Sequence, residues 1–141
     1  MITINSSFTN ALLADAAYVD VNSVMTEEEI IDALDERMTL DLAKYISSNF
    51  EVVTSENKDD VIGSGFDAVV WRGKPGTDYA GKIFVSMRGT ESLIGDIISA
   101  DIDLAISGNA RYQIMDMVNW WLKISTPSGQ TASQITLEDL Y

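Results

Sequence analysis

The chain has 141 residues, of which 46% are hydrophobic and 22% are charged, which indicates a folded protein with a real core rather than a disordered one. Nine basic residues stand against twenty-two acidic ones, and the formal charge of -13 disfavours binding to nucleic acid and to anionic membrane surfaces. Cysteine and histidine are both absent, which excludes disulfides, zinc–thiolate sites and a serine–histidine–aspartate triad within these residues.

Three helices are expected first. Residues 7–18 place apolar side chains at helical spacing and are rich in alanine. A second helix should begin at Thr26, because Thr26 and Glu29 have the spacing of a capping box. Residues 40–48 should form the third helix.

Strands are expected next. Residues 50–54 indicate a short strand and residues 55–60 a polar loop. Residues 66–71 and 82–88 should pair as an antiparallel hairpin, with a type II turn at residues 74–77. Because the apolar run 83–87 does not alternate, we expect a strand covered on both faces, as in the centre of an α/β sheet.

The last part of the chain has a mixed pattern of apolar residues. Residues 92–109 suggest a partly helical surface loop, and residues 110–124 a helix that Pro127 helps to end. One face of that helix should be apolar, with Trp120 and Met117 beside it; the face consists of Ile114, Met115, Val118, Trp121 and Leu122.

The expected architecture is a single α/β domain over residues 1–141. It comprises a helical lead-in at 1–50, a sheet and helix core at 51–124 and an unfinished tail at 125–141. About three strands make a narrow sheet for so many covering helices, so we expect partner strands to be missing. No apolar run reaches the roughly 18 residues of a membrane span. The N-terminus lacks the features of a signal peptide, so localisation stays open and includes signal-independent export.

The end of the 83–87 strand is the most informative stretch for function. Arg88 is followed by Gly89, which permits a sharp turn, and by Thr90, which offers a backbone N–H and a hydroxyl as donors. Two such donors can hold a developing oxyanion, an interaction worth about 3 to 4 kcal/mol per donor. The structural alternative is a capped strand end in which Arg88 pairs with a carboxylate.

Three segments in order, ALLADAAY, FDAVVWRG and KIFVSMRGTESLIGDIISADID, resemble the N-terminal half of the class 3 lipases, a branch of the α/β-hydrolase fold. They are similar to bacterial secreted lipases with calcium-binding repeat tails. The resemblance is loose over residues 8–124 and good over residues 82–103. Met87 stands where that family usually has phenylalanine, which a buried apolar position tolerates.

The resemblance implies a role for each matching residue. Thr90 matches the oxyanion-hole residue, and Arg88 and Gly89 the structural pair before it. Asp96 and Asp101 match acidic positions that hold the following loop in place. No cofactor or metal is implied, and the substrate of the complete enzyme would be a lipid or another ester.

The nucleophile that the family carries in a Gly-x-Ser-x-Gly elbow is missing. Ser64 has glycines directly beside it and precedes the signature strand, so it cannot be that elbow. We therefore expect the front part of a longer lipase or esterase, inactive by itself.

Three alternatives stay open. The chain could be an acidic protein-binding module for a basic partner. It could form a homodimer through the incomplete edge of its sheet, or exchange strands. A carboxylate-based site at Asp96, Asp101 and Asp103 is a further option, although these residues lack the regular spacing of a calcium loop.

Overall fold

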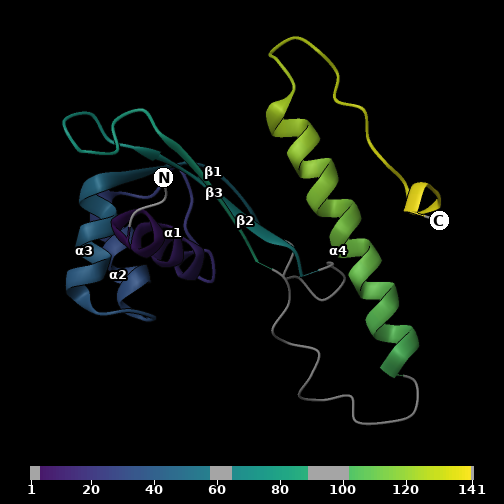
Figure 1. The fold of residues 1–141 in the computed structure, drawn as a ribbon, viewed down its shortest axis with the longest axis horizontal. Helices are drawn as coiled ribbons and strands as arrows, with labels where there is room; N and C mark the ends of the chain where they lie inside the picture. Colours follow the sequence, from purple (N-terminus) through teal and green to yellow (C-terminus); the bar gives the residue numbers. More distant parts are fainter. Residues whose placement is uncertain (1–3, 58–64, 89–101, 141) are drawn as a thin grey trace. The chain divides into compact units, whose positions relative to one another are not determined.

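The computed structural model describes residues 4–57, 65–88 and 102–140. In chain order these residues form α1 (Ile4–Ala16), α2 (Glu27–Asp35), α3 (Leu40–Asn49), β1 (Phe50–Asn57), β2 (Asp67–Gly73), β3 (Ile83–Arg88), α4 (Ile102–Ser125) and a short 3-10 helix, η1 (Leu137–Leu140). The chain divides into two compact units: α1–α3 and the sheet form the first, and α4 with the chain that follows belongs to the second (Figure 1). None of the described helices combines the length and apolar character that crossing a bilayer requires.

The sheet is antiparallel throughout, in the order β1-β2-β3. The hairpin predicted from the sequence is confirmed as β2 and β3. β1 is longer than predicted, because Ser55 to Asn57 continue the ladder with β2 after a bulge between Val52 and Thr54. The register places Asp67 opposite both Asn57 and Arg88, so these three residues share one end of the sheet.

Local sequence signals account for the helix starts. Thr26 caps α2 with the predicted capping box: its hydroxyl accepts from the Glu29 N–H at 3.3 Å, and its own N–H donates to Glu29 Oε2 at 2.7 Å. Thr39 caps α3 by accepting from the Leu42 N–H at 3.4 Å. Each cap satisfies a backbone donor that the first turn of a helix leaves without an intrahelical acceptor.

The core lies between the three helices and one face of the sheet. Trp71, Phe50 and Leu34 are almost completely buried in it. Its other buried members are Leu12, Leu13, Ala16, Val21, Ile30, Ala43, Ile46, Val52 and Val69. The first unit therefore folds around one contiguous apolar cluster that every one of its helices joins, the arrangement expected when amphipathic helices cover a sheet.

β3 is the strand on which the sequence prediction is wrong. Phe84 packs against the core cluster and Ser86 is buried, whereas Ile83, Val85 and Met87 are exposed. Side chains alternate between the two faces of a strand, and in the first unit the core cluster lies on only one of them. In the described sheet β3 is thus an edge strand rather than a central strand buried on both faces.

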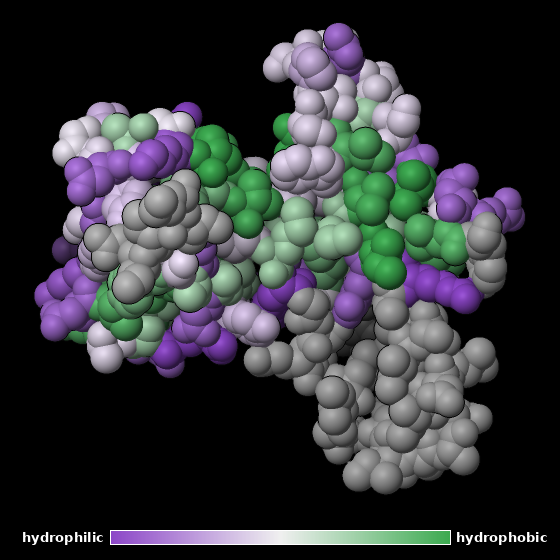
Figure 2. Space-filling view, viewed as in Figure 1, coloured by the Kyte–Doolittle hydropathy of each residue, from purple (hydrophilic) through white to green (hydrophobic). Residues whose placement is uncertain are grey.

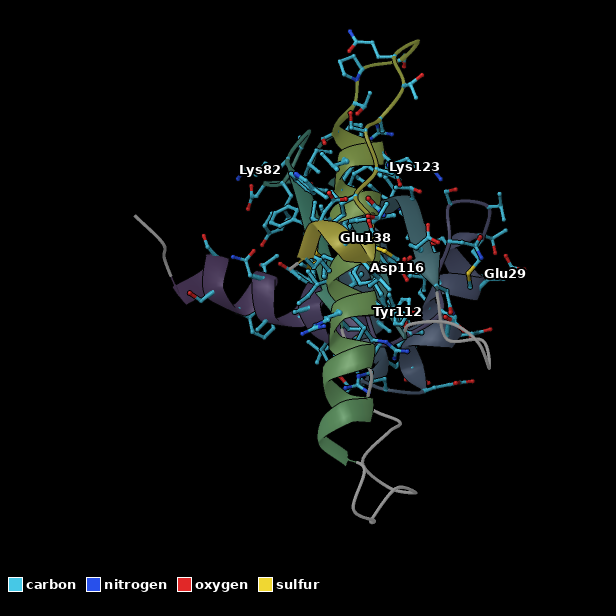
Figure 3. The ribbon with its side chains drawn as sticks, turned by 90° about the vertical axis from the view of Figure 1, so that its right-hand side faces the viewer. Glu29, Lys82, Tyr112, Asp116, Lys123 and Glu138 are labelled. Carbon is cyan, nitrogen blue, oxygen red and sulfur yellow. The ribbon has the colours of Figure 1, made fainter. Side chains whose placement is uncertain are left out.

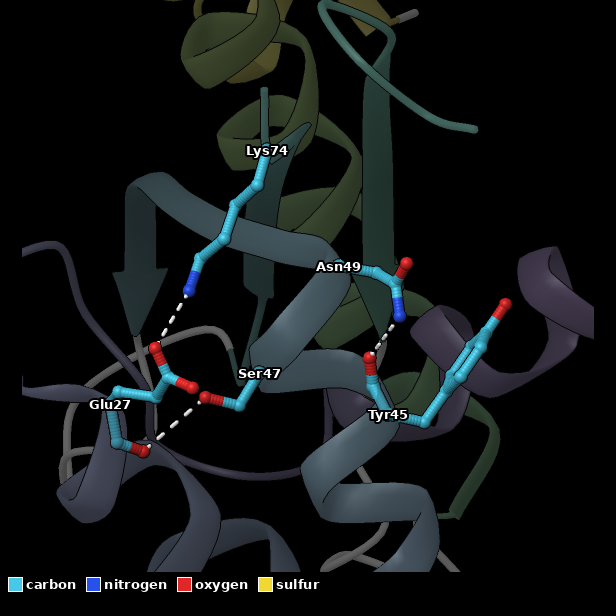
Figure 4. A network of polar contacts seen from close by, with 5 residues as sticks. All are labelled: Glu27, Tyr45, Ser47, Asn49 and Lys74. Carbon is cyan, nitrogen blue, oxygen red and sulfur yellow. Dashed lines mark hydrogen bonds and ion pairs between the residues drawn. The ribbon is translucent and has the colours of Figure 1, made fainter. Parts of the chain in front are cut away.

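A group of polar contacts ties the β2–β3 turn to the helices (Figure 4). Lys74 Nζ pairs with Glu27 Oε2 at 3.0 Å, and the Ser47 hydroxyl donates to the Glu27 carbonyl at 3.3 Å. Asn49 Nδ2 donates to the Tyr45 carbonyl at 2.8 Å, and the Asn49 carbonyl accepts from the Lys74 N–H at 2.8 Å. These bonds fix the hairpin against the α3–β1 junction.

The predicted turn at residues 74–77 is confirmed. Gly76 has φ +82, the left-handed conformation that a type II turn needs in its third position, and the Thr77 N–H bonds the Lys74 carbonyl at 3.4 Å. At the end of β2, Gly73 allows an unusually close approach, because a Cβ there would lie 1.8 Å from the Tyr79 carbonyl oxygen. The hairpin is therefore closed by two glycines with different roles.

In the second unit, α4 begins at Ile102 rather than at the predicted residue 110, so the end of the stretch that was expected as a partly helical loop belongs to this helix. After Ser125 the chain turns back along α4, and both polar atoms of the Asn119 side chain bond the backbone of Ile135, at 2.7 and 3.0 Å (Figure 1). Tyr112, Asp116 and Lys123 project from α4, and Glu138 from η1 (Figure 3).

The sequence placed Trp121 on the apolar face of α4 and Trp120 beside it, but in the structure Trp120 is the buried one of the two. Trp120 is 5% exposed and makes an edge-to-face contact with Phe66 at 5.9 Å between ring centroids, whereas Trp121 is 47% exposed. In the space-filling view, apolar side chains gather over α4, while polar ones dominate the outer surface of α2 and α3 (Figure 2). The spacing of apolar residues in the sequence identifies the apolar side of α4, but tertiary contacts such as the one with Phe66 determine which of its residues are buried.

Candidate functional site

Of the residues predicted for the oxyanion corner, only Arg88 lies among the described residues, as the last residue of β3. Gly89, Thr90, Asp96 and Asp101 lie outside them. Asp103 belongs to the first turn of α4, in a stretch that was expected as a partly helical surface loop. Arg88 and the residues that contact it therefore form the described part of the candidate site.

Arg88 forms an ion pair with Asp67, its partner across the β2–β3 ladder. The two side chains are only 13% and 7% exposed. Removing two charges from water is costly, and their mutual attraction compensates only when the geometry is good. Arg88 thus pairs with a carboxylate, as expected if the strand end has a purely structural role. The pair holds the strand end in one orientation.

Tyr18, just after α1, provides the second contact to Arg88. The Arg88 guanidinium carbon lies 5.2 Å from the Tyr18 ring centroid, and Arg88 Nη1 donates to the Tyr18 carbonyl at 3.3 Å. Arg37 also lies over the Tyr18 ring, at 4.3 Å, and its Nε pairs with Asp15 Oδ1 at 2.9 Å. We call Asp15, Arg37, Tyr18, Arg88 and Asp67 the Tyr18 stack; it links α1 and the end of α2 to the end of the sheet.

A pocket of about 290 Å³ lies next to the stack in the first unit. Its lining combines apolar and polar residues and contains no lysine or arginine among the described ones: Ala17, Val19, Asp20, Val21, Asn22, Ser55, Glu56, Asn57, Asp67 and Val69. The Asn57 amide donates to the Asp20 carboxylate, and both residues line the pocket. Over the described parts of the chain, carboxylates nowhere gather in threes in a way that could hold a metal ion.

A partly buried chain of hydroxyl groups lies elsewhere in the first unit. The Tyr79 hydroxyl bonds Thr9 Oγ1 at 3.0 Å and the Tyr45 hydroxyl at 2.6 Å. Burial, and next the hydrogen bond with Tyr79, raise the pKa of the Tyr45 hydroxyl. Tyr45 therefore stays protonated at neutral pH and serves to anchor the hairpin to α1 and α3 rather than to act as a base.

The sequence interpretation missed Asp67 and Tyr18 as partners of Arg88. A signal for Asp67 was available, since a carboxylate in the otherwise apolar run FDAVVW has to find a cation if the strand is buried. No local pattern predicts the contact between Tyr18 and Arg88, which are seventy residues apart in the chain.

Comparison with known proteins finds no family model, no curated protein and no solved structure that matches this chain. The described residues establish a small mixed α/β protein with four α-helices and a three-stranded antiparallel sheet.

Proposed function

We propose that this chain supplies the oxyanion-hole strand end of a lipase- or esterase-type α/β hydrolase whose serine nucleophile lies on further polypeptide. The substrate would be a lipid or another carboxylic ester. The chain contains no histidine and no Gly-x-Ser-x-Gly, so the attacking half of such an enzyme has to come from elsewhere.

The observation that carries this proposal is the fixation of Arg88. Buried pairing with Asp67 and contact with Tyr18 hold the residue that directly precedes Gly89 and Thr90 in the sequence. Oxyanion stabilisation depends on donors that are already in position when charge develops on the substrate, because reorienting them during the reaction costs free energy. A rigid anchor next to the donor residue meets that requirement.

Thr90 has the central role in this proposal. Its N–H and hydroxyl would donate to the oxygen of the tetrahedral intermediate, while a serine on the missing part attacks the ester carbon. Arg88 and Gly89 position the strand end, and Asp96 and Asp101 support the following loop. No metal or other cofactor takes part in this chemistry.

The first test uses the reading frame beyond Tyr141. It should encode a Gly-x-Ser-x-Gly within about forty residues, since the order of strand, turn and helix in this fold determines where the elbow falls. The 141-residue chain by itself should not hydrolyse a short-chain nitrophenyl ester above background or react with a fluorophosphonate serine probe. Turnover by the chain alone that a serine inhibitor blocks would contradict the proposal, as would a reading frame without the elbow.

The second test is made in the longer protein. Thr90→Val should lower kcat by about 100-fold or more, because an oxyanion donor is lost. Thr90→Ser keeps the hydroxyl and the N–H and should retain most of the activity. Equal losses in both variants would point to a packing role for Thr90.

An acidic protein-binding module is the second candidate, favoured by the net charge of -13 and by the absence of lysine and arginine from the pocket lining that the structure describes. Binding to a basic protein that weakens with salt, together with a reading frame that has no hydrolase elbow, would favour it over the hydrolase.

A homodimer through the sheet edge is compatible with either function. β3 is an edge strand of the described sheet and exposes Ile83, Val85 and Met87. Light scattering on the purified chain should then report twice the monomer mass, and Val85→Lys should return it to the monomer mass. A monomer at all concentrations contradicts this association.

A further inference from the structure

We propose that the pocket beside the Tyr18 stack binds a small organic ammonium ion. The pocket is formed by the chain that follows α1, at Ala17 to Asn22, and by the neighbouring ends of β1 and β2. Its described lining does not include Arg88, although Asp67, the ion-pair partner of Arg88, is part of it. The inference does not depend on the hydrolase proposal. We call it the ammonium pocket.

The charged residues of the lining indicate that the ligand carries a positive charge. Asp20, Glu56 and Asp67 contribute carboxylates, and none of the described lining residues is a lysine or an arginine. Arg88 compensates Asp67, but Asp20 receives a hydrogen bond from the neutral Asn57 amide, which leaves its negative charge in place. Together with the net charge of the chain, this lining attracts cations and repels carboxylates and phosphates.

The donors and acceptors favour a ligand that can donate several hydrogen bonds. Besides its carboxylates, the lining offers the Ser55 hydroxyl and the Asn22 and Asn57 side chains. An ammonium group carries three N–H donors and no acceptor, so it complements such a set of oxygens. A quaternary ammonium group lacks these donors and is bound by aromatic faces, which the described lining does not contain.

The apolar part of the lining favours an organic ligand over a metal ion. Ala17, Val21 and Val69 are buried residues that form apolar walls of the pocket. A calcium ion requires about six to eight oxygen ligands, whereas the described residues hold no group of three or more side chains arranged for a metal. Alkyl walls with carboxylates beside them fit an alkylamine.

The size of the pocket sets an upper limit on the ligand. A volume of about 290 Å³ corresponds to roughly ten water-sized groups, since a water molecule takes about 30 Å³ in the liquid. A short amine with an alkyl chain of a few carbons fits this volume, and a long acyl chain does not. A small and open site of this kind should bind weakly, with a dissociation constant on the order of 1 mM.

The experiment compares three probes of the same length with the purified chain at low ionic strength: n-butylammonium, n-butanol and butyrate. Two-dimensional amide NMR spectra should show saturable shifts at Val21 and Val69 with n-butylammonium, and much smaller ones with the neutral and the anionic probe. Asp20→Asn and Glu56→Gln should each weaken n-butylammonium binding about fivefold, the effect expected when one exposed charge is removed.

Glu28→Gln is the matched control, because it removes one negative charge from an exposed position on α2 outside the pocket. Its dissociation constant should equal that of the parent chain, and thermal midpoints should show that all variants fold. Several results would overturn the inference: no saturable shift with n-butylammonium, equal binding of n-butanol, or equal weakening by Glu28→Gln and the two pocket variants. None of these outcomes decides whether the chain belongs to a hydrolase.

Discussion

Arg88 and Tyr18 are linked twice, through the ring and through the backbone. The Arg88 guanidinium lies 5.2 Å from the Tyr18 ring centroid and also donates to the Tyr18 carbonyl at 3.3 Å. The side chain of Arg88 at the end of β3 thereby contacts both the ring and the backbone of Tyr18, in the segment after α1. Two elements that are remote in sequence meet at the edge of the sheet where the candidate site lies.

The ring of Tyr18, rather than its hydroxyl, should carry this link. Tyr18→Leu should lower the free energy of unfolding by about 1 to 2 kcal/mol, because two cation–π contacts are lost, whereas Tyr18→Phe should stay within about 0.5 kcal/mol of the parent. Urea unfolding curves of the two variants measure this difference. Equal destabilisation by leucine and phenylalanine would show that the hydroxyl is the important group.

The ion pair between Asp67 and Arg88 should be far more sensitive to substitution than an exposed pair in the same sheet. Asp67→Asn leaves the buried guanidinium without a counter-charge and should cost about 3 to 5 kcal/mol of unfolding free energy. The control is Glu51→Gln, which breaks the Glu51–Arg72 pair; its side chains are 40% and 52% exposed, so the cost should be below about 1 kcal/mol. Similar costs for both variants, measured by urea unfolding, would mean that the Asp67 pair is effectively solvated.

Gly73 should tolerate no side chain. The Cβ of Gly73→Ala would overlap the carbonyl oxygen of Tyr79, so the hairpin has to open, and we expect a loss of about 3 kcal/mol or more. Gly129→Ala is the matched control: Gly129 has φ +85 but nothing within 4 Å of a Cβ, and it should cost about 1 to 2 kcal/mol of backbone strain only. If thermal unfolding of Gly73→Ala resembles that of Gly129→Ala, the close approach of Tyr79 is relieved at little cost.

Glu29 provides a pH-dependent contribution from the capping box. The N–H of Thr26, and next its hydroxyl, donate to the Glu29 carboxylate and lower its pKa. A group whose pKa is lower in the folded state stabilises the fold at neutral pH, and this stabilisation is lost as the pH falls through the folded-state pKa. Stability at acid pH should therefore depend less on pH in Glu29→Gln than in the parent chain.

The cause of that pKa shift can be tested directly by an NMR titration of the carboxyl carbons. Thr26→Ala should raise the pKa of Glu29 only part of the way to its ordinary value, because the larger contribution, the backbone N–H, remains. Asp139 is an internal control: Thr136 lowers its pKa through the same two kinds of bond, and Thr26→Ala should leave it unchanged. An unchanged Glu29 pKa in Thr26→Ala would exclude any contribution from the hydroxyl.

Local features of the fold were predictable because their causes lie within a few residues. The capping box needs only Thr26 and Glu29, and the turn at residues 74–77 needs only proline followed by glycine in its two central positions. The hairpin of β2 and β3 follows from two strand patterns with a turn between them. These predictions are confirmed.

The burial of β3 could not be predicted in the same way. Phe84 on one face of β3 and Ile83, Val85 and Met87 on the other make both faces largely apolar, but these residues do not determine what lies against either face. For the same reason, the sequence could not predict that Trp120 rather than Trp121 is buried, since both residues lie within one wide apolar sector of α4.

By itself, the sequence determined the order of helices and strands, the strong negative charge, and the presence of Arg88 at a strand end before Gly89 and Thr90. Only the tertiary structure decided that Arg88 meets Asp67 and Tyr18, and that a pocket opens beside them. The physical reason is range: caps, turns and periodicity depend on neighbours in the chain, whereas an ion pair or a pocket depends on which distant segments the core brings together.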